Sequence, residues 1–136
     1  MSTKAQIEDK ISAIQRYLAI LEKFKAYPRV QLESDDMIRG ATERYLYLLA
    51  QSAIDLAEML IAYKKYRKPS TLSESFEILH EHAVIDIDLQ EKMIKLTGFR
   101  NILAHGYTKV DYGIVHSVLH HRLEDVADFI KIADQV

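Results

Sequence analysis

Apolar residues recur at intervals of three and four along most of the chain, which is the spacing of an α-helix with one buried face. The first run ends at Pro28 and forms a single stripe: Ile7, Ile11, Ile14, Leu18 and Leu21. The second run starts at Ser34-Asp35-Asp36, where acidic residues favour a helix N-terminus, and stops among lysines before Pro69. The pattern therefore predicts two long helices joined by a turn near Pro28.

Shorter helices are expected after Pro69. Thr71-Leu-Ser-Glu74 has the form of a capping box and opens a short helix that places Phe76 and Leu79 inward. A final helix from about Asp111 carries apolar residues at helical spacing: Ile114, Val115, Val118, Leu119, Leu123, Val126, Phe129 and Ile130.

The segment VIDIDL, residues 84–89, alternates apolar and acidic residues, as a half-buried strand would. It is too short and too isolated to form a sheet, so Asp86 or Asp88 is interpreted as the cap of a fourth helix, which carries Met93, Leu96, Phe99 and Leu103. The sequence thus predicts an all-α helical bundle of about five helices, built around two long antiparallel ones. We expect one domain over residues 1–136.

Composition narrows the classes of function. The chain has no cysteine, which excludes disulfides, thiol catalysis and Cys-ligated zinc. Four glycines and two prolines supply little turn chemistry for a β-protein. The first residues lack the apolar core of a signal peptide, and no uninterrupted apolar run reaches bilayer length. We therefore expect a soluble, cytoplasmic protein that does not act at a membrane.

The formal net charge of −2 argues against broad contact with a nucleic acid backbone. Proteins that neutralise many phosphates usually carry a strong basic excess. Any chemistry on nucleic acid would have to come from a small local site, which oligomerisation could concentrate.

Histidines are the residues that a cysteine-free metal site would need. His116 and His120 are four residues apart and share a helix face, and His121 adjoins them. A catalytic zinc usually takes a third ligand, and the motif H-E-x-x-H is absent from the sequence. We therefore interpret these residues as a solvated or subunit-facing polar strip and expect no metal. His80 and His82, on different helix faces, receive the same interpretation.

Two further polar features are expected to be structural. Asp55 is a single acidic residue near the apolar stripe of the second long helix, where a buried, hydrogen-bonded role is expected. Most of the eight tyrosines stand at helical spacing and are expected in the core or at an interface.

The stretch GFRNILAHGY, residues 98–107, gathers four polar side chains: Arg100, Asn101, His105 and Tyr107. Asn101 and His105 share a helix face, whereas Arg100 lies about 140° around the helix from His105. One straight helix would splay Arg100 and His105, unless it ends near Gly106 or a second subunit completes the site. Chemistry alone leaves two interpretations open. The stretch is either a polar C-terminal turn, with His105 on the helix dipole, or a functional site.

The same stretch resembles the R-x4-6-H signature of the HEPN superfamily, in the R-N-x-L-x-H-x-Y form of the HepT-like toxins. The flanking segments are similar to that family in order and spacing: ATERYLYLLAQSAIDLAEML, KPSTLSESFEIL and IVHSVLHHRLEDVADFIKIA. The resemblance covers roughly residues 34–134, and the first helix conforms only in its apolar pattern.

The resemblance implies a metal-independent ribonuclease toxin that works as a homodimer, with R-x4-H motifs from two chains facing one cleft. Arg100 would contact phosphate oxygens, His105 would move protons, and Asn101 would orient the histidine or the scissile phosphate. The implied partners are an RNA substrate, such as tRNA or mRNA, and a nucleotidyltransferase antitoxin, with no cofactor. In systems of this type the antitoxin silences the nuclease by transferring AMP from ATP to the motif tyrosine, here Tyr107.

Other interpretations remain open. The chain could be a non-catalytic helical subunit that binds a nucleotide or a partner within a nucleotidyltransferase complex, or a purely structural homodimer. Tyr107 could be a packing tyrosine with its hydroxyl in water. The presence of both Arg100 and His105, together with the tyrosine, favours the nuclease.

Overall fold

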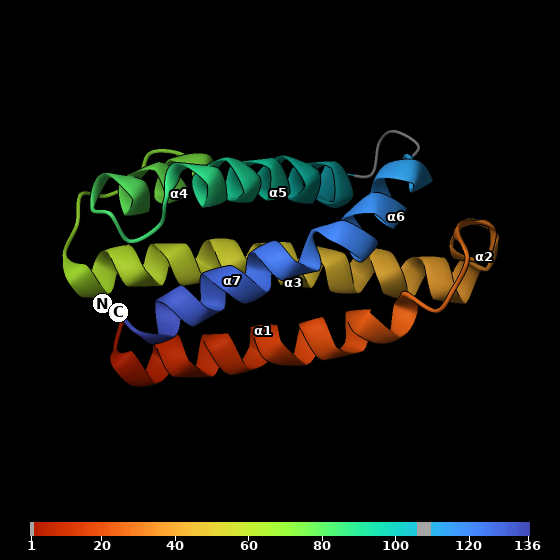
Figure 1. The fold of residues 1–136 in the computed structure, drawn as a ribbon, viewed down its shortest axis with the longest axis horizontal. Coiled ribbons are helices and arrows are strands. Elements are labelled where there is room, and N and C mark those ends of the chain that lie inside the picture. The colour runs from red at the N-terminus through yellow and green to blue at the C-terminus, as the bar shows by residue number, and fades with distance from the viewer. Residues whose placement is uncertain (1, 106–109) are drawn as a thin grey trace.

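The computed structural model describes residues 2–105 and 110–136. Along these residues the helices follow one another as α1 (Lys4–Phe24), α2 (Arg29–Ser34), α3 (Asp36–Lys64), α4 (Leu72–Glu81), α5 (Ile87–His105), α6 (Tyr112–His121) and α7 (Leu123–Asp134) (Figure 1). Neither described range contains a strand, and the predicted all-α class is confirmed.

Three long helices define the bundle. α3 runs through its middle, and α1 and α5 both pack along it in the opposite direction (Figure 1). α4 packs against α3 and α5, while α7 lies on α1. The apolar faces meet in one core, where Phe76 of α4 and Phe129 of α7 are fully buried and meet edge to face, with 5.6 Å between ring centroids. The two long antiparallel helices expected from the sequence are α1 and α3.

Acidic side chains fix where two of the long helices begin. Asp35 Oδ1 accepts hydrogen bonds from the backbone N–H groups of Met37 at 3.0 Å and Ile38 at 3.1 Å. Asp86 Oδ1 accepts one from the N–H of Leu89 at 2.8 Å, just inside α5. Residues 84–86 of the segment VIDIDL are therefore a bend and a cap, and residues 87–89 begin α5, so the segment is not a strand.

The start of α4 departs from its prediction in one detail. Thr71 Oγ1 accepts a hydrogen bond from the backbone N–H of Glu74 at 3.1 Å, as in a capping box. The Glu74 carboxylate, however, accepts from the backbone N–H of Ser70 at 3.0 Å and also binds Arg67. The reciprocal half of the predicted capping box is wrong, because an arginine and the preceding turn use that carboxylate.

The described helices outnumber the predicted five in two places. Residues 29–34, expected as part of a turn, form the short helix α2, which starts after Pro28 and buries Leu32 completely. The expected final helix is broken at Arg122 into α6 and α7. α6 packs mainly on α2, whereas α7 packs mainly on α1.

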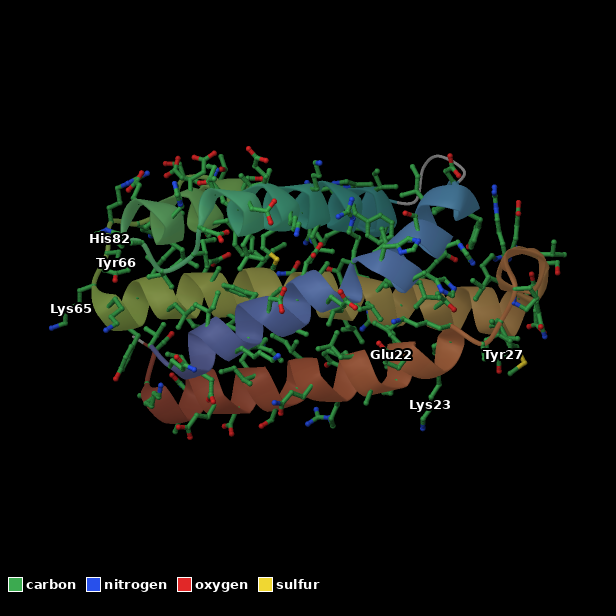
Figure 2. The ribbon with its side chains drawn as sticks, viewed as in Figure 1. Glu22, Lys23, Tyr27, Lys65, Tyr66 and His82 are labelled. Atoms are coloured by element: carbon green, nitrogen blue, oxygen red, sulfur yellow. The ribbon has the colours of Figure 1, made fainter. Side chains whose placement is uncertain are left out.

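The turn after α3 is fixed at one end of the bundle. Lys65 adopts the left-handed backbone conformation, with φ of 60°, and ends the helix before Pro69. The ring of Tyr66 stacks on His82 at the end of α4, with 3.6 Å between ring centroids (Figure 2). His82 therefore has a packing role, and the neighbouring His80 shares a hydrogen bond of 2.9 Å between its Nδ1 and the backbone oxygen of Ile85.

The length and apolar composition of α3 bear on the question of a membrane-spanning segment. Of the helices described, α3 alone is long and apolar enough to cross a membrane, with a mean hydropathy of 1.3 over its most apolar window. Asp55 and Glu58 interrupt the apolar residues of this helix, so the expectation that no uninterrupted apolar run reaches bilayer length is not contradicted. Because 56% of the window is buried inside the protein, the position of α3 at the centre of the bundle accounts for its apolar composition.

Candidate active site

Arg100 extends from α5 toward α3, where two side chains hold it. Its Nε donates a hydrogen bond of 2.7 Å to Gln51 Oε1. Its guanidinium carbon lies 5.5 Å from the centroid of the Tyr47 ring, within the range of a cation–π contact. The side chain is partly buried, so the cation is fixed at the junction of the two helices and still reaches solvent.

Asn101 is bound to its neighbour. Its Oδ1 accepts a hydrogen bond of 2.9 Å from Arg100 Nη1. The sequence places Asn101 on the helix face of His105, and the fold turns its side-chain oxygen to the arginine. The amide nitrogen is then the end that is suited to donate to a phosphate or to the histidine.

His105 is the last residue of α5 and is exposed. It therefore stands at the C-terminal end of α5, next to the last backbone carbonyl groups of the helix. α5 thus ends at His105, close to Gly106, where the sequence predicted that a helix end would let His105 depart from ideal helix geometry relative to Arg100. Tyr107 lies outside the described residues.

The sequence interpretation missed the contribution of α3. Gln51 Nε2 donates a hydrogen bond of 2.8 Å to Asp55 Oδ1, and Lys10 of α1 lies 3.6 Å from Asp55 Oδ2. A chain of polar contacts thus runs from α1 through α3 to Arg100. The spacing of four between Gln51 and Asp55 was the available signal, but the sequence does not say which helix faces that pair.

Asp55 itself corrects a prediction. It is hydrogen-bonded, as expected, but its side chain is 39% exposed rather than buried.

A pocket of about 350 Å³ opens next to these residues, between α3 and the last turns of α5. Its lining consists of Glu43, Arg44, Tyr47, Leu103 and Ala104. Arg44 approaches the Tyr47 ring to 5.7 Å, so two arginines flank one partly exposed aromatic ring. An aromatic surface with cations beside it is suited to a nucleobase and its phosphates.

The outward face of α5 carries a stripe that ends at the histidine. Its members are exposed and recur at alternating intervals of four and three: Glu91, Lys95, Gly98, Ile102 and His105. Ile102 is 47% exposed, and a Cβ added at Gly98 would meet nothing within 4 Å. The stripe combines an exposed apolar side chain with an open approach to the helix backbone.

The histidines of α6 lie together but do not form a ligand cluster. The rings of His116 and His120 are 4.1 Å apart at their centroids, and burial, followed by the charge of His116, lowers the pKa of His120. Within the described residues, no three potential ligands of the His, Asp or Glu type gather closely enough to hold a metal ion.

These features define a class: an all-α bundle with an arginine held at a helix junction and a histidine one and a half turns further along the same helix. The chain belongs to the HepT-like family, since the family model described as "Ribonuclease HepT-like" matches residues 14–133. Among characterised relatives it is similar to the mRNA nuclease HepT of Shewanella oneidensis, with 26% identity covering 93% of this chain and 94% of that protein. It is also similar to the tRNA nuclease HepT of Aphanizomenon flos-aquae, with 28% identity covering 92% and 85%.

Solved structures agree with this membership. The tri-AMPylated HEPN toxin of Shewanella oneidensis, in complex with its MNT antitoxin, superposes with a TM-score of 0.87 at 25% identity, covering 96% of this chain and 97% of that one. A toxin–antitoxin structure with AMP-PNP gives a TM-score of 0.88 at the same identity, covering 96% and 98%. The cytosolic protein YutE of Bacillus subtilis shares the fold, with a TM-score of 0.85 at 19% identity, covering 98% and 90%.

Proposed function

We propose that this protein is a metal-independent endoribonuclease toxin that acts as a homodimer and is silenced by AMP transfer from a nucleotidyltransferase antitoxin. The observation that carries the proposal is Arg100, a permanent cation fixed by Gln51 and Asn101 on the helix that ends at His105. Membership of the HepT-like ribonuclease family supports the same activity.

The chemistry needs only side chains and the RNA itself. The ribose 2′-oxygen attacks the adjacent phosphorus, the bond from phosphorus to the 5′-oxygen breaks, and a 2′,3′-cyclic phosphate forms. One histidine takes the proton of the 2′-hydroxyl and a second, protonated one gives a proton to the leaving 5′-oxygen. His105 from each of two copies supplies that pair. Arg100 binds the non-bridging oxygens, where negative charge grows in the transition state.

The outward stripe of α5 supports assembly of two copies. It exposes Ile102 next to His105 and leaves the backbone at Gly98 open to close approach. Two-fold homodimers are the commonest soluble assemblies, and contact along this stripe brings two copies of His105 to one cleft. Dimerisation also doubles the local number of arginines in a chain whose net charge is −2.

The pocket beside Arg100 provides a binding surface for RNA next to the proposed cleavage site. A base flanking the scissile phosphate stacks on Tyr47, while Arg44 holds a neighbouring phosphate. The relatives are described as nucleases of mRNA in one case and of tRNA in the other, and both substrates present single-stranded segments.

Control by the antitoxin follows from the solved relatives. The Shewanella oneidensis toxin is tri-AMPylated in its complex with an MNT antitoxin. We extend that control to this chain and assign Tyr107 as the acceptor, because it stands two residues beyond His105. Anionic adenylyl groups at that position occupy the site and repel RNA. We also place the activity in the cytoplasm, as for the similar protein described as cytosolic, and assign it to one domain over residues 1–136.

Removing either side chain of the pair tests the activity. Arg100→Ala and His105→Ala should each slow RNA cleavage at least about 100-fold, because one removes phosphate stabilisation and the other removes proton transfer. His121→Ala, which alters an exposed histidine on α6, is the matched control and should cleave like wild type. The rate is measured on labelled RNA, with circular dichroism to verify the fold.

The same assay tests the metal-free mechanism. EDTA should leave the rate unchanged. If the chelator stops cleavage and a divalent ion restores it, the mechanism is wrong and His116 and His120 become candidate ligands. If wild-type protein cuts no RNA but binds the antitoxin, the non-catalytic binding subunit is the better description.

A further inference from the structure

Gln51 is the only uncharged side chain within the chain of polar contacts that links α1, α3 and Arg100 in the described residues. Its two amide ends have different tasks. Oε1 accepts the Nε–H of Arg100 at 2.7 Å, and Nε2 donates to Asp55 Oδ1 at 2.8 Å. Asp55 is an acceptor, so it fixes which end of the amide faces the arginine. The opposite amide orientation would set donor against donor at Arg100.

We propose that Gln51 is a positioning residue for the cleavage reaction and that Asp55 orients it. The inference rests on the proposed ribonuclease function, because it assigns Arg100 to the scissile phosphate. Gln51 binds Nε, which is not part of the terminal Nη fork that matches phosphate oxygens. Gln51 therefore holds the guanidinium at Nε and leaves the two terminal Nη groups to contact the phosphate of the substrate.

The three neighbours restrict Arg100 in different ways. Gln51 binds Nε of the guanidinium and Asn101 Oδ1 binds Nη1. The guanidinium carbon lies over the Tyr47 ring, 5.5 Å from its centroid. Asn101 is adjacent to Arg100 on the same helix and moves with it, whereas Gln51 belongs to α3. Gln51 is thus the hydrogen-bonding contact that ties the direction of the arginine to the rest of the bundle.

The effect of each residue on the cleavage rate should decrease with the number of contacts that separate it from Arg100. Gln51 touches Arg100 directly, Asp55 acts through Gln51, and Lys10 reaches only Asp55 over 3.6 Å with both side chains partly exposed. An ion pair of that kind contributes little. Variants at these positions should therefore give graded losses of activity, largest for Gln51 and smallest for Lys10.

The test replaces Gln51 by Leu, which has similar size and no hydrogen-bonding groups. With single-turnover cleavage of RNA, Gln51→Leu should lower the maximal rate about 10- to 100-fold while half-saturation changes less than about threefold, because the arginine is misdirected but RNA still binds. Gln15→Leu, at an exposed position on α1, is the matched control and should behave as wild type.

A second readout does not depend on activity. The side-chain Nε–H of Arg100 can be followed by NMR, and its exchange with water should be slow in wild type and markedly faster in Gln51→Leu. If both the exchange and the maximal rate are unchanged in Gln51→Leu, Gln51 does not position Arg100. If wild-type protein cleaves no RNA, the proposed function fails, while the exchange measurement still decides whether Gln51 holds the arginine.

A swapped pair separates positioning from simple packing. Gln51→Glu alone sets two carboxylates at hydrogen-bonding distance and should slow cleavage. Combining it with Asp55→Asn restores a donor at position 55 and keeps an acceptor toward Arg100, so the maximal rate should recover by at least about fivefold over Gln51→Glu. A double variant that is no faster than Gln51→Glu would overturn the assigned orientation of the amide.

Discussion

In the proposed mechanism the guanidinium of Arg100 binds phosphate, which requires a fixed direction, and its contacts with Gln51, Asn101 and Tyr47 supply that direction. A free arginine side chain carries about 2 kcal/mol of rotamer entropy, which binding would otherwise have to overcome. Here most of that ordering takes place on folding, because the contacts are made within the protein. The entropy cost of ordering Arg100 is therefore met when the chain folds and does not have to be met again when the substrate binds.

The proposed role of Tyr107 as the AMP acceptor predicts a variant in which regulation is separated from catalysis. Tyr107→Phe removes only the hydroxyl that would accept AMP, so the variant should cleave RNA as wild type does and escape neutralisation by the antitoxin. A phenol is largely protonated at neutral pH, so transfer should require the nucleotidyltransferase with ATP and Mg²⁺. Intact-mass spectrometry after incubation should show whole-number additions of AMP to the wild-type protein alone.

Tyr63→Phe is the control for this experiment, because Tyr63 is an exposed tyrosine on α3. It should be modified and neutralised as wild type is. If the antitoxin neutralises Tyr107→Phe as well as it neutralises wild type, or if the AMP adducts map to another tyrosine, the acceptor is not Tyr107.

At the scale of helices, local signals predicted local structure well. Asp35, Asp86 and Asp111 each cap the helix expected to follow them, because a cap needs only its own next few residues. The break at Arg122 and the contact of Gln51 with Arg100 depend on which helices become neighbours, so spacing alone did not reveal them. The motif positions could be proposed from the sequence because their signal is contiguous, and their roles stay a prediction.

His120, near the end of α6, should make the free energy of unfolding depend on pH. Burial, followed by smaller electrostatic contributions from His116, Lys25 and His121 and opposed by Glu22, lowers the pKa of His120 below its ordinary value of 6.5. As the pH falls through 6.5, the unfolded chain takes up a proton that the folded chain resists. The contribution of this histidine therefore lowers the free energy of unfolding progressively below neutral pH.

Thermal unfolding from pH 7.5 to pH 5.5 measures the effect, and His120→Gln should lose less stability over that range than wild type. His121→Gln, on the exposed side of α6, should stay close to the wild-type curve, because His121 makes the smallest of the contributions that lower the pKa of His120. Parallel curves for His120→Gln and wild type would contradict the assignment.

For the whole molecule, the proposed mechanism depends on assembly of two copies through the outward stripe of α5. Ile102→Glu places a charge at its exposed apolar residue, so the dissociation constant of the homodimer should rise at least about tenfold, or about 1.4 kcal/mol. RNA cleavage at low protein concentration should fall in parallel, because two copies of His105 no longer meet. Light scattering and sedimentation measure the assembly.

Ile87→Glu is the matched control, since Ile87 is 51% exposed at the opposite end of the same helix. It should leave assembly and cleavage unchanged. A monomeric Ile102→Glu protein that keeps full activity would show that one copy is sufficient.

The two ends of the described chain lie side by side, and the Nζ of Lys4 donates a hydrogen bond of 2.9 Å to the backbone oxygen of Val136. Both ends stand at the opposite end of the bundle from the last turn of α5 (Figure 1). Two copies could therefore be joined tail to head by a flexible peptide without obstructing the site. Such a tandem protein breaks the symmetry of the pair, since each half can carry a different defect. It would show whether one arginine and one histidine, supplied by opposite halves, are enough to cut a strand.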